Sequence, residues 1–195
     1  MDDSWWFAWG AIKDKTLSDA VETCPAVYTT RYEKRAYFEA MMLDNMATPV
    51  NDYEILVGGH LVSEKYAFVE EASLQDFRTK KASLLDSGWG SNSTGHRVID
   101  FEKLFRIGVR GVIAEIDGRL ASLSPSMPEY VSRRGFYRGC KMCMEAILRF
   151  ADRYAAALTA AAETAEGARK QELLDMAERM TRVPAGPAVN FRDAL

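Results

Sequence analysis

An apolar stripe with helical spacing, near the middle of the sequence, most constrains how this chain can fold. Seven residues follow one another at steps of four, three, four, three, four and four: Phe136, Cys140, Cys143, Ile147, Phe150, Tyr154 and Leu158. Residues at such steps share one face of an α-helix. The stripe therefore predicts one long helix, from about Glu129 to Thr164, whose apolar face packs against other elements.

Most of the remaining chain is also predicted to be helical. Apolar residues at mixed three- and four-residue steps predict a helix over 29–46, with Thr29 or Thr30 as its N-cap. Asp100 is the expected N-cap of a helix over 101–123, and a further helix is predicted over 167–182. A short apolar piece, 53–57, is strand-like. The predicted fold class is mostly α.

Two glycines fall inside the predicted helix over 101–123. Gly108 and Gly111 each lower the helix propensity of that segment. We expect them where another backbone packs closely against the helix, because only a residue without a side chain leaves room for it.

The last residues resemble the first turn of a helix. Asn190 is a favourable N-cap, and Asp193 at the third helical position resembles a loose capping box. One turn of helix has little to sustain it alone. We therefore expect the sequence to be the front part of something longer.

Composition and charge exclude several classes of protein. The 195 residues are 48% hydrophobic and 27% charged, as is usual for a soluble globular domain. A net charge of -3 gives no indication of a nucleic-acid partner. No apolar run approaches the roughly 20 residues that span a membrane, and an acidic start does not suit a signal peptide. Three cysteines without a spaced framework suit the reducing cytoplasm.

The CxxC pair, Cys140 and Cys143, allows a metal site, a redox pair or simple packing. Structural zinc needs four ligands, and the chain offers only Cys24, His60 and His96 besides the pair. A redox pair belongs at the N-terminus of a helix, whereas this pair falls well inside one. Because both cysteines lie within the apolar stripe, the sequence favours packing, and no metal site is predicted.

His96 is the strongest candidate for a binding residue. It follows the glycine-rich loop "SGWGSNSTG" and precedes the expected cap Asp100. It is either a loop histidine bonded to a backbone carbonyl or a group that contacts substrate. His60 has less support. The sequence contains no GxGxxG, P-loop, nucleophile elbow or HExxH motif.

Four stretches resemble, in order, the N-terminal region of glycyl radical enzymes, in the pyruvate formate-lyase-like branch that includes glycerol and diol dehydratases. They are "YTTRYEKRAYFEAMMLDNMATPVNDYEILVGG", "GHRVIDFEKLFRIGVRGVIAEIDGRL", "GFYRGCKMCMEAILRFADRYAAAL" and "ARKQELLDMAERMTRVPAGPAVNFRDAL". The resemblance covers about residues 28–195 and implies that 1–195 form a partial domain, the N-terminal helical portion of an α/β barrel. The segment between Gly59 and Gly90 is shorter than in the family.

The resemblance implies a radical reaction whose central residues are not in this chain. In such enzymes a glycyl radical near the C-terminus, installed by a radical SAM activase, generates a thiyl radical on a cysteine of a central loop. The full enzyme would cleave C–C or C–O bonds, as a formate C-acetyltransferase of anaerobic metabolism or as a diol-type dehydratase. It would act on a small molecule as a cytoplasmic homodimer. This chain alone is expected to be inactive.

Site residues carry over at few positions. His96 matches the histidine of a "GH" motif that bonds a substrate hydroxyl in the glycerol dehydratase branch, and Asn92 matches a position beside it. No residue of this chain matches a catalytic position. A second interpretation stays open: a self-contained α-helical interaction module, or a subunit without catalysis.

Overall fold

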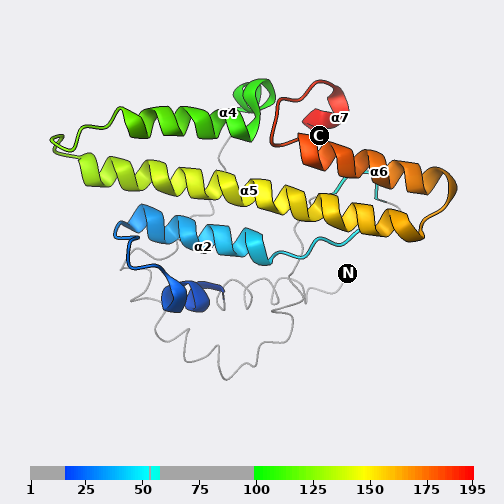
Figure 1. The fold of residues 1–195 in the computed structure, drawn as a ribbon, viewed down its shortest axis with the longest axis horizontal. Helices are drawn as coiled ribbons and strands as arrows, with labels where there is room; N and C mark the ends of the chain where they lie inside the picture. Colours follow the sequence, from blue (N-terminus) through cyan, green and yellow to red (C-terminus); the bar gives the residue numbers. More distant parts are fainter. Residues whose placement is uncertain (1–15, 53, 58–98) are drawn as a thin grey trace. The chain divides into compact units, whose positions relative to one another are not determined.

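The computed structural model describes residues 16–52, 54–57 and 99–195. Within these ranges the chain is helical and contains no strand, which confirms the mostly-α prediction. The elements are a short helix over 16–23, α2 (Arg31–Asn45), α4 (Phe101–Ala121), α5 (Tyr130–Thr164), α6 (Gly167–Arg182) and α7 (Phe191–Ala194) (Figure 1).

The described residues divide between two compact units. Unit 1 contains residues 16–47 and 116–143, and unit 2 contains 48–57, 99–115 and 144–195. Both α4 and α5 contribute residues to each unit. The helix predicted from the apolar stripe is confirmed as α5, within one residue of its expected start.

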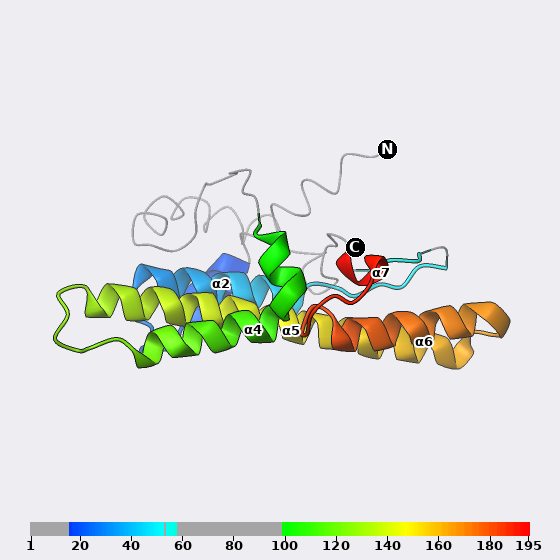
Figure 2. The same ribbon diagram turned by 90° about the horizontal axis from the view of Figure 1, so that it is seen from above.

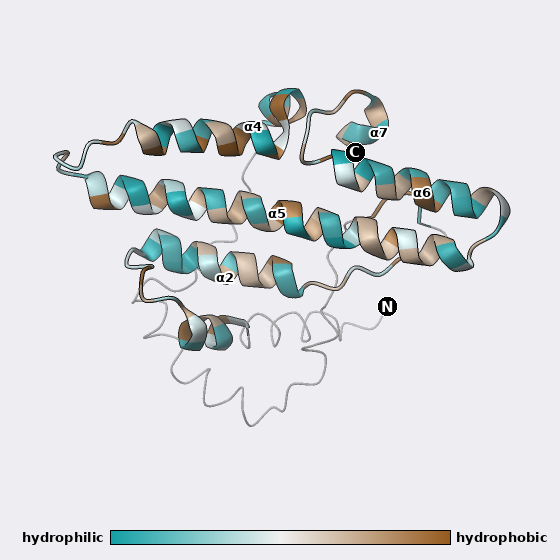
Figure 3. Cartoon of the chain, in the orientation of Figure 1, coloured by the Kyte–Doolittle hydropathy of each residue, from teal (hydrophilic) through white to brown (hydrophobic). Residues whose placement is uncertain are grey.

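The stripe on α5 is buried only toward its C-terminal end. Tyr154 and Leu158 are 1% and 0% exposed, whereas Phe136 is 48% exposed and contacts the ring of Tyr32 edge-on. Hydrophilic and hydrophobic positions alternate around α5 and α6 in Figure 3, as expected of amphipathic helices.

In unit 1, α2 lies beside the first part of α5 in both ribbon views (Figures 1 and 2). A Cβ atom at Gly135 would lie 2.3 Å from Thr30 Oγ1, and one at Gly139 would lie 2.8 Å from the Tyr32 carbonyl oxygen. This close approach explains why glycines, rather than Phe136, are buried on this part of α5.

The start of α2 is fixed by a buried carboxylate. Thr30 is the N-cap of a capping box: its backbone N–H donates to Glu33 Oε2 at 3.1 Å, and the Glu33 backbone N–H donates to Thr30 Oγ1 at 3.3 Å. Arg138 of α5 pairs with Glu33 Oε1 at 2.9 Å. Glu33 is 2% exposed. The positive charge of Arg138, which is distant in sequence, therefore balances a buried negative charge inside unit 1.

In unit 2, α4 is broken at Gly108. This residue has φ 63° and ψ 178°, a backbone conformation that is almost restricted to glycine. A Cβ atom there would lie 2.4 Å from the Gly186 carbonyl carbon. The expectation of a close backbone is confirmed at Gly108, but the unbroken helix predicted through it is wrong. At Gly111 the close neighbour is the side chain of Ile107, not another backbone.

The break in α4 is joined to the loop that follows α6. The loop contains a cis peptide bond between Val183 and Pro184. Three backbone hydrogen bonds connect the two segments: Val109 N–H to Pro184 O at 2.8 Å, Arg110 N–H to Ala185 O at 3.0 Å, and Ala188 N–H to Phe105 O at 2.9 Å. Amide groups that lack helical partners at the break are therefore satisfied by the loop.

The core of unit 2 lies between the end of α5 and α6, which runs back along it (Figures 1 and 2). Five buried residues form this core: Leu158, Ala162, Leu173, Met176 and Ala177. Val50 and Val57, from the segment 48–57, pack against it.

The strand predicted over 53–57 is wrong for residues 54–57, which form an irregular bend, and Tyr53 lies outside the described residues. Arg169 of α6 donates to the carbonyl oxygens of Glu54 and Asn51 at 2.9 and 2.8 Å. The Arg169 guanidinium therefore donates hydrogen bonds to carbonyl oxygens that would bond to a neighbouring strand in a sheet.

None of the helices in the described part of the chain has the length and apolar character needed to cross a membrane.

We predict that Gly108→Ala destabilises the protein more than Gly167→Ala does. Both residues have positive φ, but a Cβ atom at Gly167 meets nothing within 4 Å. Both variants carry backbone strain, whereas only the first forces a side chain into the loop backbone, which adds about 1–3 kcal/mol. Urea unfolding followed by circular dichroism measures the difference. Equal losses in the two variants would contradict the close packing at Gly108.

Candidate functional site

The two substrate-binding residues predicted from the sequence, His96 and Asn92, lie outside the described residues. The described chain resumes at Ile99, and Asp100 Oδ1 accepts a hydrogen bond from the backbone N–H of Lys103 at 3.1 Å. This contact confirms Asp100 as the cap of α4. The roles of His96 and Asn92 stay predictions.

Cys140 and Cys143 are free, partly buried thiols, less deeply buried than the packing interpretation predicts. Desolvation raises the pKa of Cys140. Desolvation, with the nearby carboxylate of Glu39, raises the pKa of Cys143 to about 11. Both thiols are therefore protonated near neutral pH and are poor nucleophiles. Across 16–52, 54–57 and 99–195, no three His, Cys, Asp or Glu residues are grouped to hold a metal ion.

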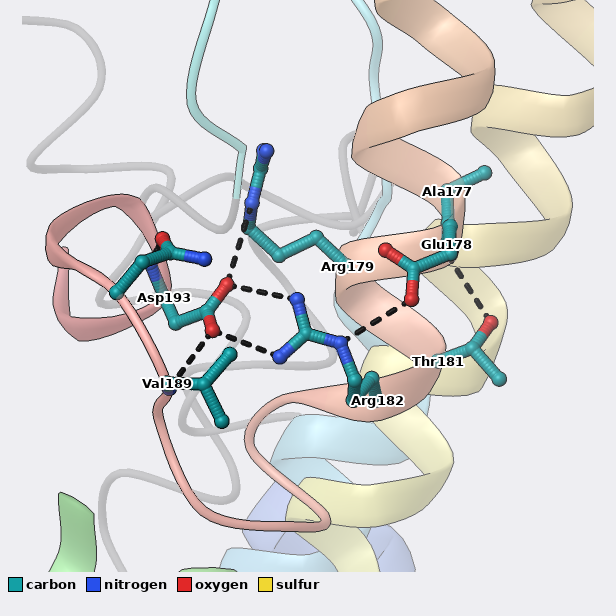
Figure 4. A network of polar contacts seen from close by, with 8 residues as sticks. Ala177, Glu178, Arg179, Thr181, Arg182, Val189 and Asp193 are labelled. Carbon is teal, nitrogen blue, oxygen red and sulfur yellow. Dashed lines mark hydrogen bonds and ion pairs between the residues drawn. The ribbon is translucent and has the colours of Figure 1, made fainter.

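A second group of polar side chains surrounds Asp193 at the C-terminal end of unit 2 (Figure 4). The backbone N–H of Asp193 donates to Asn190 Oδ1 at 3.1 Å, which confirms Asn190 as the cap of α7. Its carboxylate accepts two hydrogen bonds from Arg182, at 2.7 and 2.8 Å, and one from the Val189 N–H at 2.9 Å. The loose capping box predicted there is therefore replaced by hydrogen bonds to the Asp193 carboxylate from Arg182 of α6 and from the Val189 N–H.

The Asp193 carboxylate is shielded and strongly stabilised in its charged form. Its side chain is 0% exposed. Hydrogen bonds from Arg182, and then from the Val189 N–H, hold the pKa of Asp193 well below its ordinary value. This ion pair fixes α7 and the preceding loop onto α6 at every physiological pH.

Sequence reasoning missed this pair, although one signal was present. Arg179 and Arg182 both lie in the last turn of α6, where cations suit the helix dipole. Asp193 lies in the first turn of the next helix, only a loop away. Such an arrangement permits a contact, but whether Arg182 reaches Asp193 depends on the conformation of the loop between the two helices.

An apolar pocket of about 290 Å³ lies beside this pair. Its walls are residues 55–57, the first turns of α4, the last turns of α6, the loop that leads into α7, and residues 192–195. All of these belong to unit 2. We call it the unit 2 pocket.

Arg179 gives the unit 2 pocket a polar group without a hydrogen-bond partner. Its Nε atom is buried and makes no hydrogen bond to the described residues. Asp193 Oδ1 is 3.6 Å from this atom, which is within range of an ion pair but too long for a hydrogen bond. The pocket therefore combines large apolar side chains with one desolvated donor.

Comparison with known proteins identifies the family. A sequence model of the pyruvate formate lyase-like family matches residues 33–195. This match covers most of the chain, so the protein belongs to the pyruvate formate lyase-like family, which contains the glycyl radical enzymes.

Curated relatives match the chain over a small part of their own length. Isethionate sulfite-lyase of Bilophila wadsworthia is 38% identical over 100 residues, which are 50% of this chain and 12% of the relative. (2S)-3-sulfopropanediol dehydratase of Klebsiella oxytoca is 35% identical over 102 residues, 52% of this chain and 12% of the relative. Indoleacetate decarboxylase of Tractidigestivibacter scatoligenes is 30% identical over 136 residues, 69% of this chain and 15% of the relative.

Solved structures of glycyl radical enzymes share the fold. A structure for 1,2-propanediol dehydration in Roseburia inulinivorans matches with a TM-score of 0.76 at 16% identity, covering 94% of this chain and 28% of that one. The glycerol dehydratase of Clostridium butyricum gives 0.71 at 19% identity, covering 94% and 29%. These matches confirm that the chain has the fold of the N-terminal helical portion of the glycyl radical enzyme barrel.

We predict that Cys143 reacts slowly with thiol reagents. With its pKa near 11, about one thiol in a thousand is ionised at pH 8, far fewer than for an ordinary free cysteine. The alkylation rate of the folded protein, measured by mass spectrometry, should rise sharply in denaturant, where the pKa returns to normal. A folded-state rate equal to the denatured rate would contradict the desolvation of this thiol.

We predict that the stabilising effect of Asp193 is lost in acid. Because its pKa is lower in the folded state than the unfolded value of about 3.9, the effect is complete above that value and declines as pH falls below it. The free energy of unfolding should therefore differ between wild type and Asp193→Asn by a constant amount from pH 8 to about 5. The difference should shrink below about pH 4.

Asp175→Asn is the matched control, since Asp175 lies on the exposed face of α6 and accepts only from Gln171 Nε2 among the described contacts. It should change stability little at any pH. A loss in Asp175→Asn as large as that in Asp193→Asn would contradict a special role for the buried pair.

Proposed function

We propose that this chain is the N-terminal part of a glycyl radical enzyme of the dehydratase or lyase type. The observation that carries the proposal is the family match over 33–195, joined to a shared fold over 94% of the chain. The complete enzyme would cleave a C–C or C–O bond by a radical reaction. The catalytic glycine and cysteine would belong to the barrel, which the chain would complete from one side.

A dehydratase or lyase reaction fits better than a formate C-acetyltransferase reaction. The relatives described above are, by name, a sulfite-lyase, a dehydratase and a decarboxylase. Two of these names specify small hydroxylated sulfonates, isethionate and sulfopropanediol. We therefore propose a small, polar, hydroxylated substrate, with acyl transfer as the less supported alternative.

The chain's own contribution to the reaction would be a scaffold and a binding residue. His96 would donate a hydrogen bond to, or accept one from, a substrate hydroxyl, and Asn92 would flank it. The protein radical, installed by a radical SAM activase, would supply hydrogen abstraction from the barrel side. In this proposal the chain has no activity alone, and the assembled enzyme is a cytoplasmic homodimer.

The described residues support a scaffold role rather than a catalytic one. The thiols of α5 have raised pKa values, and the two buried carboxylates, of Glu33 and Asp193, are each bonded to an arginine. Groups that are paired or neutralised in this way hold structure in place but do not readily take part in proton or group transfer.

We predict that His96→Ala, in the assembled enzyme that carries the barrel, lowers kcat/KM for a hydroxylated substrate. Loss of a buried hydrogen bond of about 1.5–3 kcal/mol corresponds to roughly a tenfold to hundredfold decrease. His60→Ala is the matched control and should leave kcat/KM nearly unchanged. Turnover and substrate affinity are measured after activation, with the radical content determined by electron paramagnetic resonance.

Unchanged kcat/KM in His96→Ala, at equal radical content, would remove His96 from the substrate pocket. Failure to find any glycyl radical polypeptide joined to or associated with this chain would contradict the proposed function itself. That outcome would favour a helical interaction module without catalysis.

A further inference from the structure

We propose that the unit 2 pocket is the surface on which the barrel part of the enzyme packs, with an apolar side chain in the pocket and an acceptor oxygen for Arg179. This inference rests on the proposed function and specifies where on the chain the assembly forms. It follows from the exposed apolar walls, from the buried Arg179 Nε atom that makes no hydrogen bond, and from the rigidity of the pocket.

The exposure of the walls favours a polypeptide over a small molecule. Large apolar side chains remain open to solvent around the pocket: Ile55 is 70% exposed, Phe101 50% and Leu195 67%. A small-molecule site normally encloses most of its ligand. Exposed apolar groups gathered around one hollow are instead typical of a surface that another protein segment covers.

Arg179 specifies the chemistry of the segment that covers the pocket. Its Nε atom is buried without a hydrogen bond, and Asp193 Oδ1, 3.6 Å away, forms an ion pair with it but is too distant for a hydrogen bond. A desolvated donor left without a hydrogen bond costs about 1–3 kcal/mol. A backbone carbonyl or carboxylate beside the inserted apolar side chain would satisfy it.

The walls of the pocket are held in place before anything binds. The Arg182–Asp193 pair fixes α7 on α6. The backbone hydrogen bonds at Val109 and Ala188 fix α4 to the loop between α6 and α7. A preformed pocket loses little conformational entropy on binding, and such pockets are where the strongest contacts of an interface concentrate.

The size of the related proteins supports the barrel part as the occupant. The fold matches cover 94% of this chain but only 28% and 29% of the two solved chains. Most of each of those chains therefore lies outside the matched portion and is available to pack against it. A second copy of this chain is the competing occupant, and the experiment distinguishes it.

The test is site-specific photo-crosslinking in the assembled enzyme. A benzophenone amino acid replaces Phe101 at the pocket or, as the matched control, Val131. Both are exposed apolar residues in the first turn of a long helix, at 50% and 65% exposure, but Val131 belongs to unit 1. Mass spectrometry identifies the crosslinked peptides. We expect the pocket position to capture a peptide from the barrel, and the control position not to capture that peptide.

Charge substitutions at the same two positions provide a second measurement. Glu at either position suits the positive end of a helix dipole, so each variant should fold. Phe101→Glu should weaken association with the barrel part at least tenfold, or lower the melting temperature of the assembly when both parts share one chain. Val131→Glu should change neither.

Three results would overturn the inference. In the first, the barrel is present but crosslinks from position 101 fall on a second copy of this chain. In the second, the barrel is present but Phe101→Glu weakens the assembly no more than Val131→Glu does. In both of these cases the proposed function stands and the pocket assignment fails. In the third, no barrel polypeptide is recovered with the chain, and the proposed function fails as well.

Discussion

The arrangement of unit 2 depends on the absence of a side chain at residue 108. Gly108 adopts a φ of 63°, and its α-carbon faces the backbone of Gly186 so closely that a Cβ atom would lie 2.4 Å from the carbonyl carbon. The break turns the amide groups of Val109 and Arg110 away from their own helix and toward the loop after α6. One steric condition thus positions the loop, and the loop in turn forms a wall of the unit 2 pocket.

The two arginines at the end of α6 make different contacts with the Asp193 carboxylate beside that pocket. Arg182 makes two hydrogen bonds to Asp193, whereas Arg179, three residues earlier, lies 3.6 Å from the same carboxylate without a hydrogen bond. Oδ1 of this carboxylate accepts one hydrogen bond, from Arg182, and Oδ2 accepts one from Arg182 and one from the Val189 N–H. Arg182 therefore stabilises unit 2, and in the proposed assembly Arg179 would interact with the segment that covers the pocket.

Local signals in the sequence predicted much of the fold, and contacts between distant residues account for what they missed. The spans of α2, α5 and α6 and the caps at Thr30, Asp100 and Asn190 depend on neighbours within one or two turns, so periodicity and cap chemistry were sufficient. The bend at Gly108 depends on Gly186, and the Glu33 carboxylate depends on Arg138. The supposed strand at 54–57 is instead bonded by Arg169. The substrate residues predicted from the family resemblance, His96 and Asn92, fall where the structure describes nothing.

Burial and ion pairs control the charge of several ionisable groups in the described residues. Burial raises the thiol pKa of both cysteines in the CxxC pair, which suppresses the nucleophilic thiolate. The buried carboxylates of Glu33 and Asp193 are held by arginines. Only two buried side-chain polar atoms among the described residues lack a hydrogen bond, Thr16 Oγ1 and Arg179 Nε, and the second borders an open apolar pocket. In the proposed assembly, this donor and the exposed apolar side chains beside it would contact the barrel part of the enzyme.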